Sequence, residues 1–419
     1  MKRLIGVLVL FLLINTVTAF NSSWGNHIDV NVTGGDSALK DYDLWFKVDK
    51  QNSMESDYKD VIPVNGTCME GNTGILKYHI QWYNITESHL HVRVPNFNTG
   101  INNFCFYFNN TDGIDYQDEY NTYDVNYSLL HHLSDTSGNI TDSSKYNITG
   151  IVWGNVTYNQ NGVIGKGICV KDGVVYTGYD YQGLHESTTE GWFKSGNAIS
   201  GHLYNAFNTG TDGSLVVTDN TNNGVRFIIT LDITKTIHTY PTISTSQWEY
   251  IGTVYDGGDI KYYRNGVLVN STSTTGSINP STCKLTYGGR NCTGTFNAGW
   301  DGCIDEFAVS DKTRSPDYFK RRYQNTNDSL TVYGGVKELT TTSTTTSTTI
   351  GTTSTTTSTT STITTGIREV GEFIEETPSL FVYLPNLIAY FGMALIVIVL
   401  VLFIKDMIDS IGDRVKKVV

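Results

Sequence analysis

Adjacent acidic residues in the second half of the chain raise the question of hydrolytic chemistry. Two carboxylates that face one site can act as acid and base on a glycosidic bond. Asp305 and Glu306 are neighbours in a predicted strand, so their side chains point to opposite faces and cannot form such a pair. A Gly-x-Ser-x-Gly segment, which would indicate a serine hydrolase, does not occur. The sequence therefore predicts that the protein is not an enzyme, with a glycoside hydrolase as the least favoured alternative.

Two pairs of histidines are the next candidates, because neutral imidazole is a common metal ligand. His89 and His91 stand two residues apart on a predicted strand, so they share a face and could hold one ion. Paired histidines in a Tyr-rich strand more often cover a surface, and we favour that interpretation. His131 and His132 are adjacent and point to opposite faces of a strand, so they are the weaker candidate.

Alternating apolar residues predict the elements that must position these side chains. In the segment 302–310, odd-numbered residues share one strand face and even-numbered residues the other. A turn then leads into a short helix over 318–323. Asn265-Gly266 lies between two alternating runs, which is typical of a hairpin with a type I′ turn because both central residues need a positive φ.

The segment 302–317 resembles the closing strand and turn of laminin-G-like, or concanavalin A-like, jelly rolls. It carries Gly-x-Ile-Asp-Glu-Phe-x-Val-Ser, followed by Arg-Ser-x-Asp. Upstream landmarks of that family match in order at 127–135, 165–173, 189–194 and 248–269. The resemblance implies an all-β fold, a jelly-roll sandwich of two antiparallel sheets, over residues 121–335.

Residues 20–120 precede this region and are also rich in predicted strands. Period-two alternation marks 78–83, 89–94 and 104–108. The segment 91–109 resembles the end of a small uncharacterised β-domain that precedes laminin-G-like jelly rolls in prokaryotic surface proteins. This resemblance implies a smaller N-terminal β-domain and no particular chemistry.

Calcium is the cofactor that the jelly-roll resemblance implies. Such domains often hold one Ca²⁺ at the rim of a sheet through carboxylate and carbonyl oxygen atoms. The matching positions are Asp135 and Asp142, in the loop after the first jelly-roll strand, and Asp256 and Asp301 are further candidates. The alternative is that these aspartates stabilise turns by accepting hydrogen bonds from backbone N–H groups.

Six cysteines form an even set, which in an exported chain indicates disulfides, with buried free thiols as the alternative. The set that we prefer is Cys68–Cys105, Cys283–Cys292 and Cys169–Cys303. The first pair would close the N-terminal domain and the second a short hairpin. The jelly-roll resemblance implies the third pair, because the first and last strands of that architecture lie side by side.

Targeting and anchoring signals flank the two predicted domains. Residues 1–19 have the charged start, short apolar run and small residues that are typical of a secretory signal peptide. Residues 336–379 form a Thr/Ser-rich stalk with an acidic end. Residues 380–404 are apolar enough for a transmembrane helix, and the basic tail 405–419 places the head outside. The sequence predicts a single-pass protein of a cell surface or viral envelope, in an archaeon or one of its viruses.

The charge of the chain limits its partners. The 419 residues carry a formal net charge of −12, which excludes nucleic acid as the expected partner. We expect a surface adhesin or attachment protein whose jelly-roll head binds a glycan or a surface receptor. The alternative is a structural coat protein without an external ligand. Twelve Asn-x-Ser/Thr sequons accord with a glycosylated exterior: Asn21, Asn31, Asn65, Asn84, Asn109, Asn126, Asn139, Asn147, Asn155, Asn270, Asn291 and Asn327.

Overall fold

The computed structural model describes residues 24–338, apart from short internal gaps. The gaps are residues 69–73, 111–112, 181–183, 197–200, 207–213, 220–223, 232–233, 242, 244–246, 282, 293–294, 298 and 328. All described residues belong to one compact unit, Met1–Leu339. The predicted signal peptide, transmembrane helix and tail lie outside the described residues, as does the stalk beyond residue 338. In the part of the chain that is described, no helix has the length and apolarity needed to cross a membrane.

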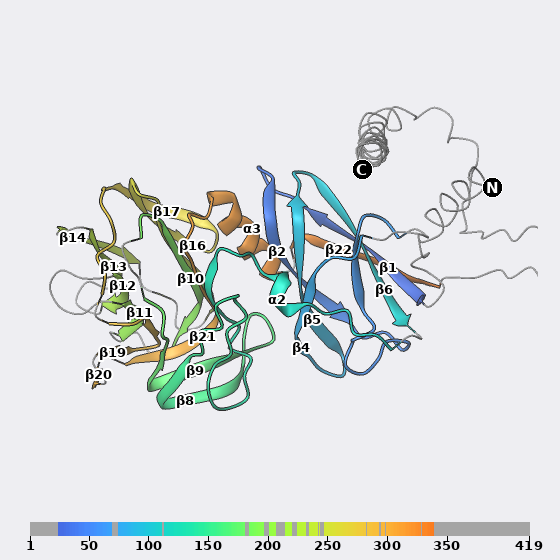
Figure 1. Ribbon diagram of the computed structural model, residues 1–419, viewed down its shortest axis with the longest axis horizontal. Helices are drawn as coiled ribbons and strands as arrows, with labels where there is room; N and C mark the ends of the chain where they lie inside the picture. The colour runs from blue at the N-terminus through green and yellow to red at the C-terminus, as the bar shows by residue number, and fades with distance from the viewer. Residues whose placement is uncertain are drawn as a thin grey trace, which may run out of the picture. The chain divides into compact units, whose positions relative to one another are not determined.

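The first of two all-β lobes is a sandwich of two antiparallel sheets, which we call the sandwich lobe (Figure 1). One sheet has the strand order β22-β1-β6-β3 and the other β2-β5-β4. Its core consists of the apolar side chains that alternate along these strands, such as Val30, Phe46 and Phe106. The strands are β1 Trp24–Thr33, β2 Leu39–Asp49, β3 Ile62–Asn65, β4 Tyr78–Tyr83, β5 Glu87–Phe97, β6 Ile101–Asn110 and β22 Thr331–Glu338.

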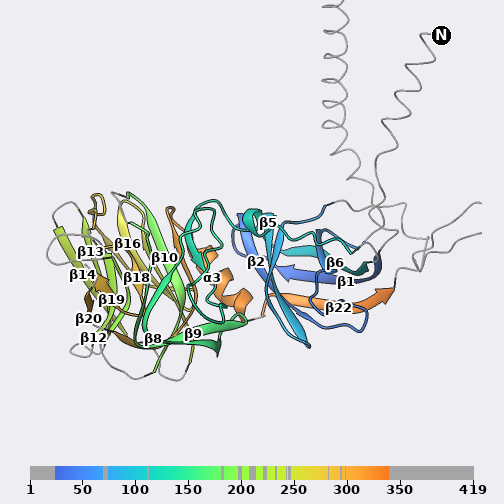
Figure 2. The same ribbon diagram turned by 60° about the horizontal axis from the view of Figure 1, so that its bottom comes forward.

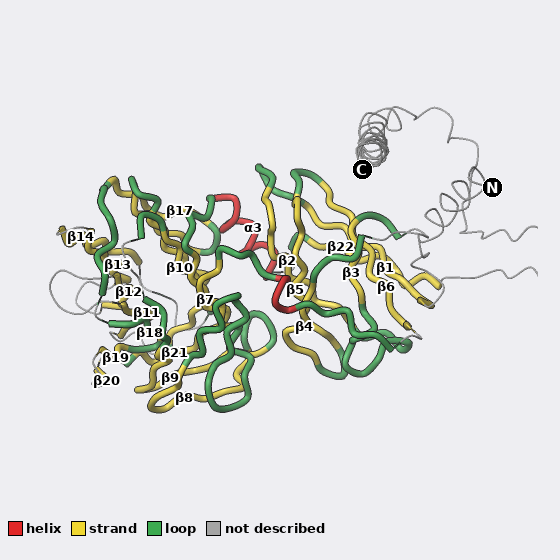
Figure 3. The backbone as a smooth tube through the Cα atoms, in the orientation of Figure 1, coloured by secondary structure: helices red, strands yellow, loops and turns green. Residues whose placement is uncertain are grey.

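The second lobe, the jelly-roll lobe, contains the strands from β7 to β21. Its main hydrogen-bonded order is β14-β13-β12-β11-β18-β9-β21-β10-β15-β16-β17, with β7 on β21 and β8 on β9. Figure 3 shows how strands dominate both lobes, as the all-β prediction requires. The strands are β7 Tyr127–His131, β8 Ile151–Asn161, β9 Lys166–Tyr176, β10 Ser187–Ser195, β11 Gly201–Ala206, β12 Ser214–Asp219, β13 Gly224–Leu231, β14 Thr234–Pro241, β15 Glu249–Tyr255, β16 Asp259–Arg264, β17 Val267–Ser273, β18 Thr286–Tyr287, β19 Arg290–Cys292, β20 Thr295–Asn297 and β21 Trp300–Ser310.

Strand β21 is the central strand of the jelly-roll lobe. It pairs with β9, β10 and β7, and every residue from Ile304 to Ser310 is buried. Cys303 lies directly opposite Cys169 on β9, and the two form a disulfide. Cys68–Cys105 and Cys283–Cys292 are also bonded. These three pairs are the ones preferred from the sequence.

The Asn-Gly turn joins β16 to β17. Asn265 and Gly266 have φ angles of 50° and 77°, the two positive values that a type I′ turn needs. The Asn265 side chain also accepts a hydrogen bond from the Tyr250 N–H at 2.9 Å. This turn was predictable because its conformation follows from the two residue types alone.

The C-terminal strand β22 departs from the predicted domain boundary. The sequence analysis placed residues up to 335 in the jelly roll, but β22 pairs with β1, with Asn26 opposite Glu338. Figure 2 shows β22 beside β1 in the sandwich lobe. The jelly-roll lobe is therefore inserted between β6 and β22. The sequence did not indicate this pairing, because most β22 side chains are exposed and give little apolar alternation.

The helix α3, Pro316–Thr326, lies between the two lobes (Figure 2). Ser315 caps its N-terminus by accepting from the Tyr318 N–H, and Pro316 opens its first turn. The Phe319 ring stacks on Tyr263 of the jelly-roll lobe, with ring centroids 4.1 Å apart. At the other end, the Asn325 side chain accepts from the Trp45 N–H and donates to the Trp45 carbonyl, both at 2.8 Å. The helix thus connects the core of one lobe to the backbone of the other.

Candidate binding site between the two lobes

The predicted calcium ligands have their oxygen atoms engaged in local hydrogen bonds. Asp142 is buried and accepts from the N–H groups of Leu130, Ser144 and Ile148 at 2.6–2.9 Å and from the Ser144 hydroxyl at 2.7 Å. Asp135 accepts from the Thr141 N–H and hydroxyl. Among the described residues, neither aspartate belongs to a group of three metal-compatible side chains. This is the turn-stabilising arrangement weighed as the alternative, and calcium binding stays a prediction.

Asp305 and Glu306 have different surroundings from those expected of a regular strand. The β10–β21 register shifts here, and Glu306 has a φ of 51°, so a β-bulge interrupts the alternation. The Asp305 carboxylate accepts from the N–H groups of Val163 and Ile164 at 2.6 and 2.9 Å. Glu306 instead accepts from His132. The two carboxylates therefore bond different groups and do not form an acid/base pair, as the sequence predicted. Both strand alternation and the bulge separate them.

Burial and charge push the pKa values of this pair apart. Burial, reinforced by the charge of Glu306, raises the pKa of Asp305 well above its usual range. Burial also acts to raise the pKa of Glu306, but the charges of His132, His91 and Arg322 outweigh it and lower that pKa. Glu306 is therefore the ionised member of the pair.

The histidines are distributed differently from either predicted pair. His91 is fully buried and lies beside His132, with the two rings tilted by 40° and their centroids 4.7 Å apart. His89 points elsewhere and packs edge-on against Trp45 and Trp82. His131 bonds the Tyr287 hydroxyl and the Ile148 carbonyl within the jelly-roll lobe. The structure thus brings together one histidine from each predicted pair, which no spacing within the sequence could indicate.

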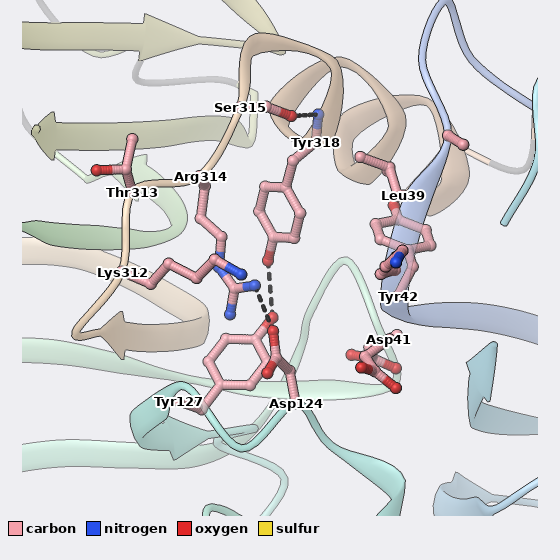
Figure 4. Close-up of a pocket in the computed structure, with 13 residues that line it drawn as sticks. Leu39, Asp41, Tyr42, Asp124, Tyr127, Lys312, Thr313, Arg314, Ser315 and Tyr318 are labelled. Carbon is pink, nitrogen blue, oxygen red and sulfur yellow. Dashed lines mark hydrogen bonds and ion pairs between the residues drawn. The ribbon is translucent and has the colours of Figure 1, made fainter. Parts of the chain in front are cut away.

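A small polar cleft lies between β2 and the 312–318 segment (Figure 4). It has a volume of about 180 Å³ and is lined by residues of both lobes. Arg314 donates to Asp124 at 2.6 Å, and its guanidinium lies 4.8 Å from the ring centroids of both Tyr127 and Tyr318. The two tyrosine hydroxyls bond each other at 2.7 Å, and that of Tyr318 also donates to Glu190. These rings are buried and their hydroxyls are paired, so they offer no free aromatic face. Tyr318 also packs edge-on against Tyr42 of the sandwich lobe.

A larger groove, the Trp82 groove, opens elsewhere along the same boundary. It has a volume of about 590 Å³, and its lining includes Trp45, Trp82 and His89 of the sandwich lobe, Lys166 of the jelly-roll lobe and the end of α3. Trp82 is partly exposed, whereas Trp45 is only 4% exposed. Gly165 has a φ of 62°, and a Cβ there would lie 2.9 Å from Trp82, so glycine allows the β8–β9 turn to approach the indole.

Polar groups surround the aromatic floor of the Trp82 groove. The Lys47 ammonium pairs with Glu87 at 2.8 Å, and the Lys166 ammonium lies 5.8 Å from the Trp82 ring centroid. The buried Trp45 Nε1 and His89 Nδ1 atoms have no hydrogen-bond partner among the described residues. Burial lowers the pKa of His89 against the opposing effect of Glu87. Both nitrogen atoms are buried, so the polar groups that a ligand in the groove could contact are the side chains at its rim.

Of the residues that line this groove, the sequence pointed to His89 as a possible metal ligand and to Asn84 and Asn327 as sequons, but to neither tryptophan. Trp82 stands in the predicted strand 78–83, but the β4–β5 register shifts between Ile80 and Trp82, so alternation could not give its direction. Trp192 and Trp300 are buried and available only for packing. The missing signal is three-dimensional, because the groove forms only where the two lobes meet.

Comparison with known proteins identifies the fold of the second lobe. Residues 170–318 match a family model described as the concanavalin A-like lectin/glucanases superfamily. This match lies within the predicted jelly roll and confirms the laminin-G-like resemblance for that segment. No curated protein matches the chain.

Several solved structures are similar to part of the chain. The receptor-binding domain of botulinum neurotoxin mosaic serotype C/D is 15% identical, with a TM-score of 0.38, and the match covers 48% of this chain and 51% of that domain. The serotype G binding domain is 16% identical, with a TM-score of 0.38 and coverages of 46% and 50%. The serotype DC binding domain in complex with SialylT is 14% identical, with a TM-score of 0.39 and coverages of 48% and 51%. The match thus spans about half the length of each of these domains.

Proposed function

We propose that the protein is a surface adhesin or attachment protein that binds a glycan through the Trp82 groove. The observation that carries the proposal is the combination, in one groove, of a partly exposed indole with the charged side chains of Lys47, Glu87 and Lys166. Ligand sites in proteins combine an apolar or aromatic surface with a few placed polar groups. A sugar ring has the matching chemistry, since it presents an apolar C–H face and a rim of hydroxyls.

Each groove residue has a distinct part in this proposal. The Trp82 indole would stack on the C–H face of a sugar ring. His89 packs edge-on against Trp82 and Trp45 and would hold the indole in place. Lys47, Glu87 and Lys166 would contact hydroxyls at the rim.

The test is a glycan array probed with the full chain and two variants. Trp82→Ala is expected to reduce binding at least tenfold, because it removes the stacking surface. Trp153→Ala is the matched control, since Trp153 is 46% exposed on β8 and lies outside the groove. Equal binding by both variants and the parent chain would contradict the groove as the site.

Two sequons require a further control. Asn84 and Asn327 both line the Trp82 groove, and a glycan attached to either residue could occupy it. The array is therefore repeated with Asn84→Gln and Asn327→Gln in one chain. Stronger binding of array glycans by this variant would identify attached sugar as a competitor within the same groove, whereas a loss of binding would count against a free groove.

The glycan array and three further assays separate the remaining hypotheses. On the glycan array, binding that is lost with a chelator and restored by calcium would support the ion predicted at Asp135 and Asp142. Silence from the folded chain would favour a protein receptor or a coat role, for which ordered two-dimensional arrays of the purified protein are the expected sign. Release of reducing sugar that Glu306→Gln abolishes would favour the glycoside hydrolase.

The proposed single-pass anchoring predicts that the protein fractionates with membranes and that external protease removes residues 24–338.

A further inference from the structure

Five ionisable side chains meet in a buried cluster where the two lobes touch. Asp43 and His91 come from β2 and β5 of the sandwich lobe, His132 follows β7, Glu306 lies in β21 and Arg322 in α3. Each is at most 4% exposed. Buried charges at this density require close pairing, so the contacts within this cluster determine what it can bind.

Imidazole and carboxylate groups face one another across the lobe boundary. His91 Nδ1 donates to Asp43 Oδ1 at 2.9 Å, and His132 Nδ1 donates to Glu306 Oε1 at 2.9 Å. One ligand atom from each of His91, His132 and Glu306 lies within 4.8 Å of the other two. The other group of this kind in the described chain includes Cys68, whose sulfur is in a disulfide and so cannot act as a thiolate ligand.

We propose that His91, His132 and Glu306 form a binding site for a divalent transition-metal ion, with zinc as the ion that the donor set favours. Two imidazoles and one carboxylate are a frequent protein donor set for such ions. Zinc holds these ligands at about 2.0–2.2 Å, so the donor atoms, which lie within 4.8 Å of one another, would have to move closer together by side-chain rotation. The proposal is independent of the Trp82 groove.

The surroundings of His91 are those of a metal-ligating imidazole. Ligating histidines usually donate their second ring N–H to a carboxylate, which fixes the ring and its tautomer. Asp43 accepts from His91 Nδ1 in this way, and Arg322 holds the second Asp43 oxygen atom at 2.8 Å. His91 Nε2 is thereby directed away from Asp43, toward Gln81 and Glu306.

The Gln81 side chain bridges two of the proposed ligands. Its Oε1 lies 2.5 Å from His91 Nε2, and its Nε2 donates to Glu306 Oε1 at 2.8 Å. A metal ion would replace this amide as the link between the imidazole and the carboxylate. Gln81 is only partly buried, so its side chain can turn outward and leave room for the ion.

The backbone of Glu306 supplies a second, independent observation. Its φ of 51° is uncommon for a residue other than glycine, and such backbone strain concentrates at functional sites. His132 Nδ1 faces Glu306, so Nδ1 would bind the ion. The Nε2 atom, which is buried without a hydrogen-bond partner among the described residues, would then carry the ring proton.

The charges of the cluster can accommodate a dication. With neutral imidazoles, the two carboxylates and Arg322 sum to −2 + 1 = −1. A bound dication would change this sum to +1, which is also the value reached when both imidazoles carry an extra proton. Arg322 contacts the outer Glu306 oxygen atom at 3.5 Å, so the guanidinium and the ion would use different carboxylate oxygen atoms.

The experiment is a metal titration of the full chain, produced without a histidine tag and stripped with a chelator. Cobalt(II) serves as the coloured probe, and zinc is then added to displace it. The expected result is one equivalent of bound metal per chain and a melting temperature that rises with zinc, because the ion would link the two lobes. Ligand variants His132→Gln and Glu306→Gln are expected to lose affinity at least tenfold.

Two further variants keep the test decisive if a ligand variant fails to fold. His131→Gln removes the adjacent buried histidine, which is outside the cluster, and should leave one equivalent of metal bound. Gln81→Ala removes the amide that occupies the bridging position and should bind cobalt at least as tightly as the parent chain. Failure of both the parent chain and Gln81→Ala to bind cobalt or zinc would overturn the proposal, as would undiminished affinity in folded His132→Gln.

Discussion

Single residues in this protein carry roles that strand alternation does not predict. Alternation correctly assigned Asp305 and Glu306 different neighbours, but the bulge at Glu306 turns its carboxylate toward His132 and Gln81. Glutamate rarely adopts positive φ, so its residue type gave no signal for this turn. The site residues were predictable only where they depend on local sequence, as in the aspartates that stabilise turns.

The buried pair Arg314–Asp124 gives a prediction at this scale. Burial acts to raise the pKa of Asp124, but the charge of Arg314 and the hydrogen bonds from Arg314 and Asn126 together outweigh it and lower that pKa. A carboxylate with a lowered pKa stabilises the fold above its unfolded pKa, and this stability is lost as the pH falls through its folded pKa. Asp124→Asn should therefore cost about 3 kcal/mol at pH 7, because it leaves a buried guanidinium unpaired, and stability should then fall less steeply below about pH 4.

Urea unfolding as a function of pH measures both effects. Asp259→Asn is the control, because Asp259 is more exposed and its oxygen atom lies 3.8 Å from Lys261. Its loss should cost below about 1 kcal/mol. Equal losses of unfolding free energy in the two variants would show that burial does not determine how much the Arg314–Asp124 pair stabilises the fold.

At the scale of elements, the sequence predicted strands better than their partners. The predicted strand 78–83 coincides with β4, and the Asn-Gly turn has the predicted conformation. These features depend on local periodicity and turn chemistry. The pairing of β22 with β1 is a contact between the two ends of the described chain, and local patterns hold no information about it.

The disulfides give a prediction at the scale of elements. Cys169–Cys303 joins residues 134 positions apart, and Cys283–Cys292 joins residues 9 apart. In the chain-entropy model, removing these bonds costs about 5 and about 3 kcal/mol. Replacing each pair with alanines and comparing urea midpoints tests the order. A larger loss from the short loop would mean that strain or packing, and not loop length, dominates.

The whole described molecule depends on contacts between its lobes. Helix α3 packs on both, the cores are continuous through Tyr318 and Phe319, and the buried cluster and the Trp82 groove each use side chains from the two lobes. Sequence patterns indicate two consecutive domains, and they hold no information about which side chains meet at the boundary between them. The fold class could be predicted from the sequence, whereas the grouping of residues into the candidate site could not.

This continuity predicts that the lobes unfold together. Calorimetry of the full chain should show one transition for residues 24–338, with calorimetric and van't Hoff enthalpies that agree. Asn325→Ala removes both hydrogen bonds to the Trp45 backbone and should lower the midpoint by destabilising the boundary. Two separate transitions in the parent chain would contradict a shared core.

The position of β22 has a consequence for synthesis on the ribosome. Asn26 pairs with Glu338, a separation of 338 − 26 = 312 residues. At about 5–20 residues per second, β1 emerges about 15 to 60 s before its last neighbour. During that time one edge of β1 is unpaired, and an open strand edge is a template for pairing with other chains. The sandwich lobe cannot be completed until the final strand emerges, so we expect nascent chains to need protection along that edge.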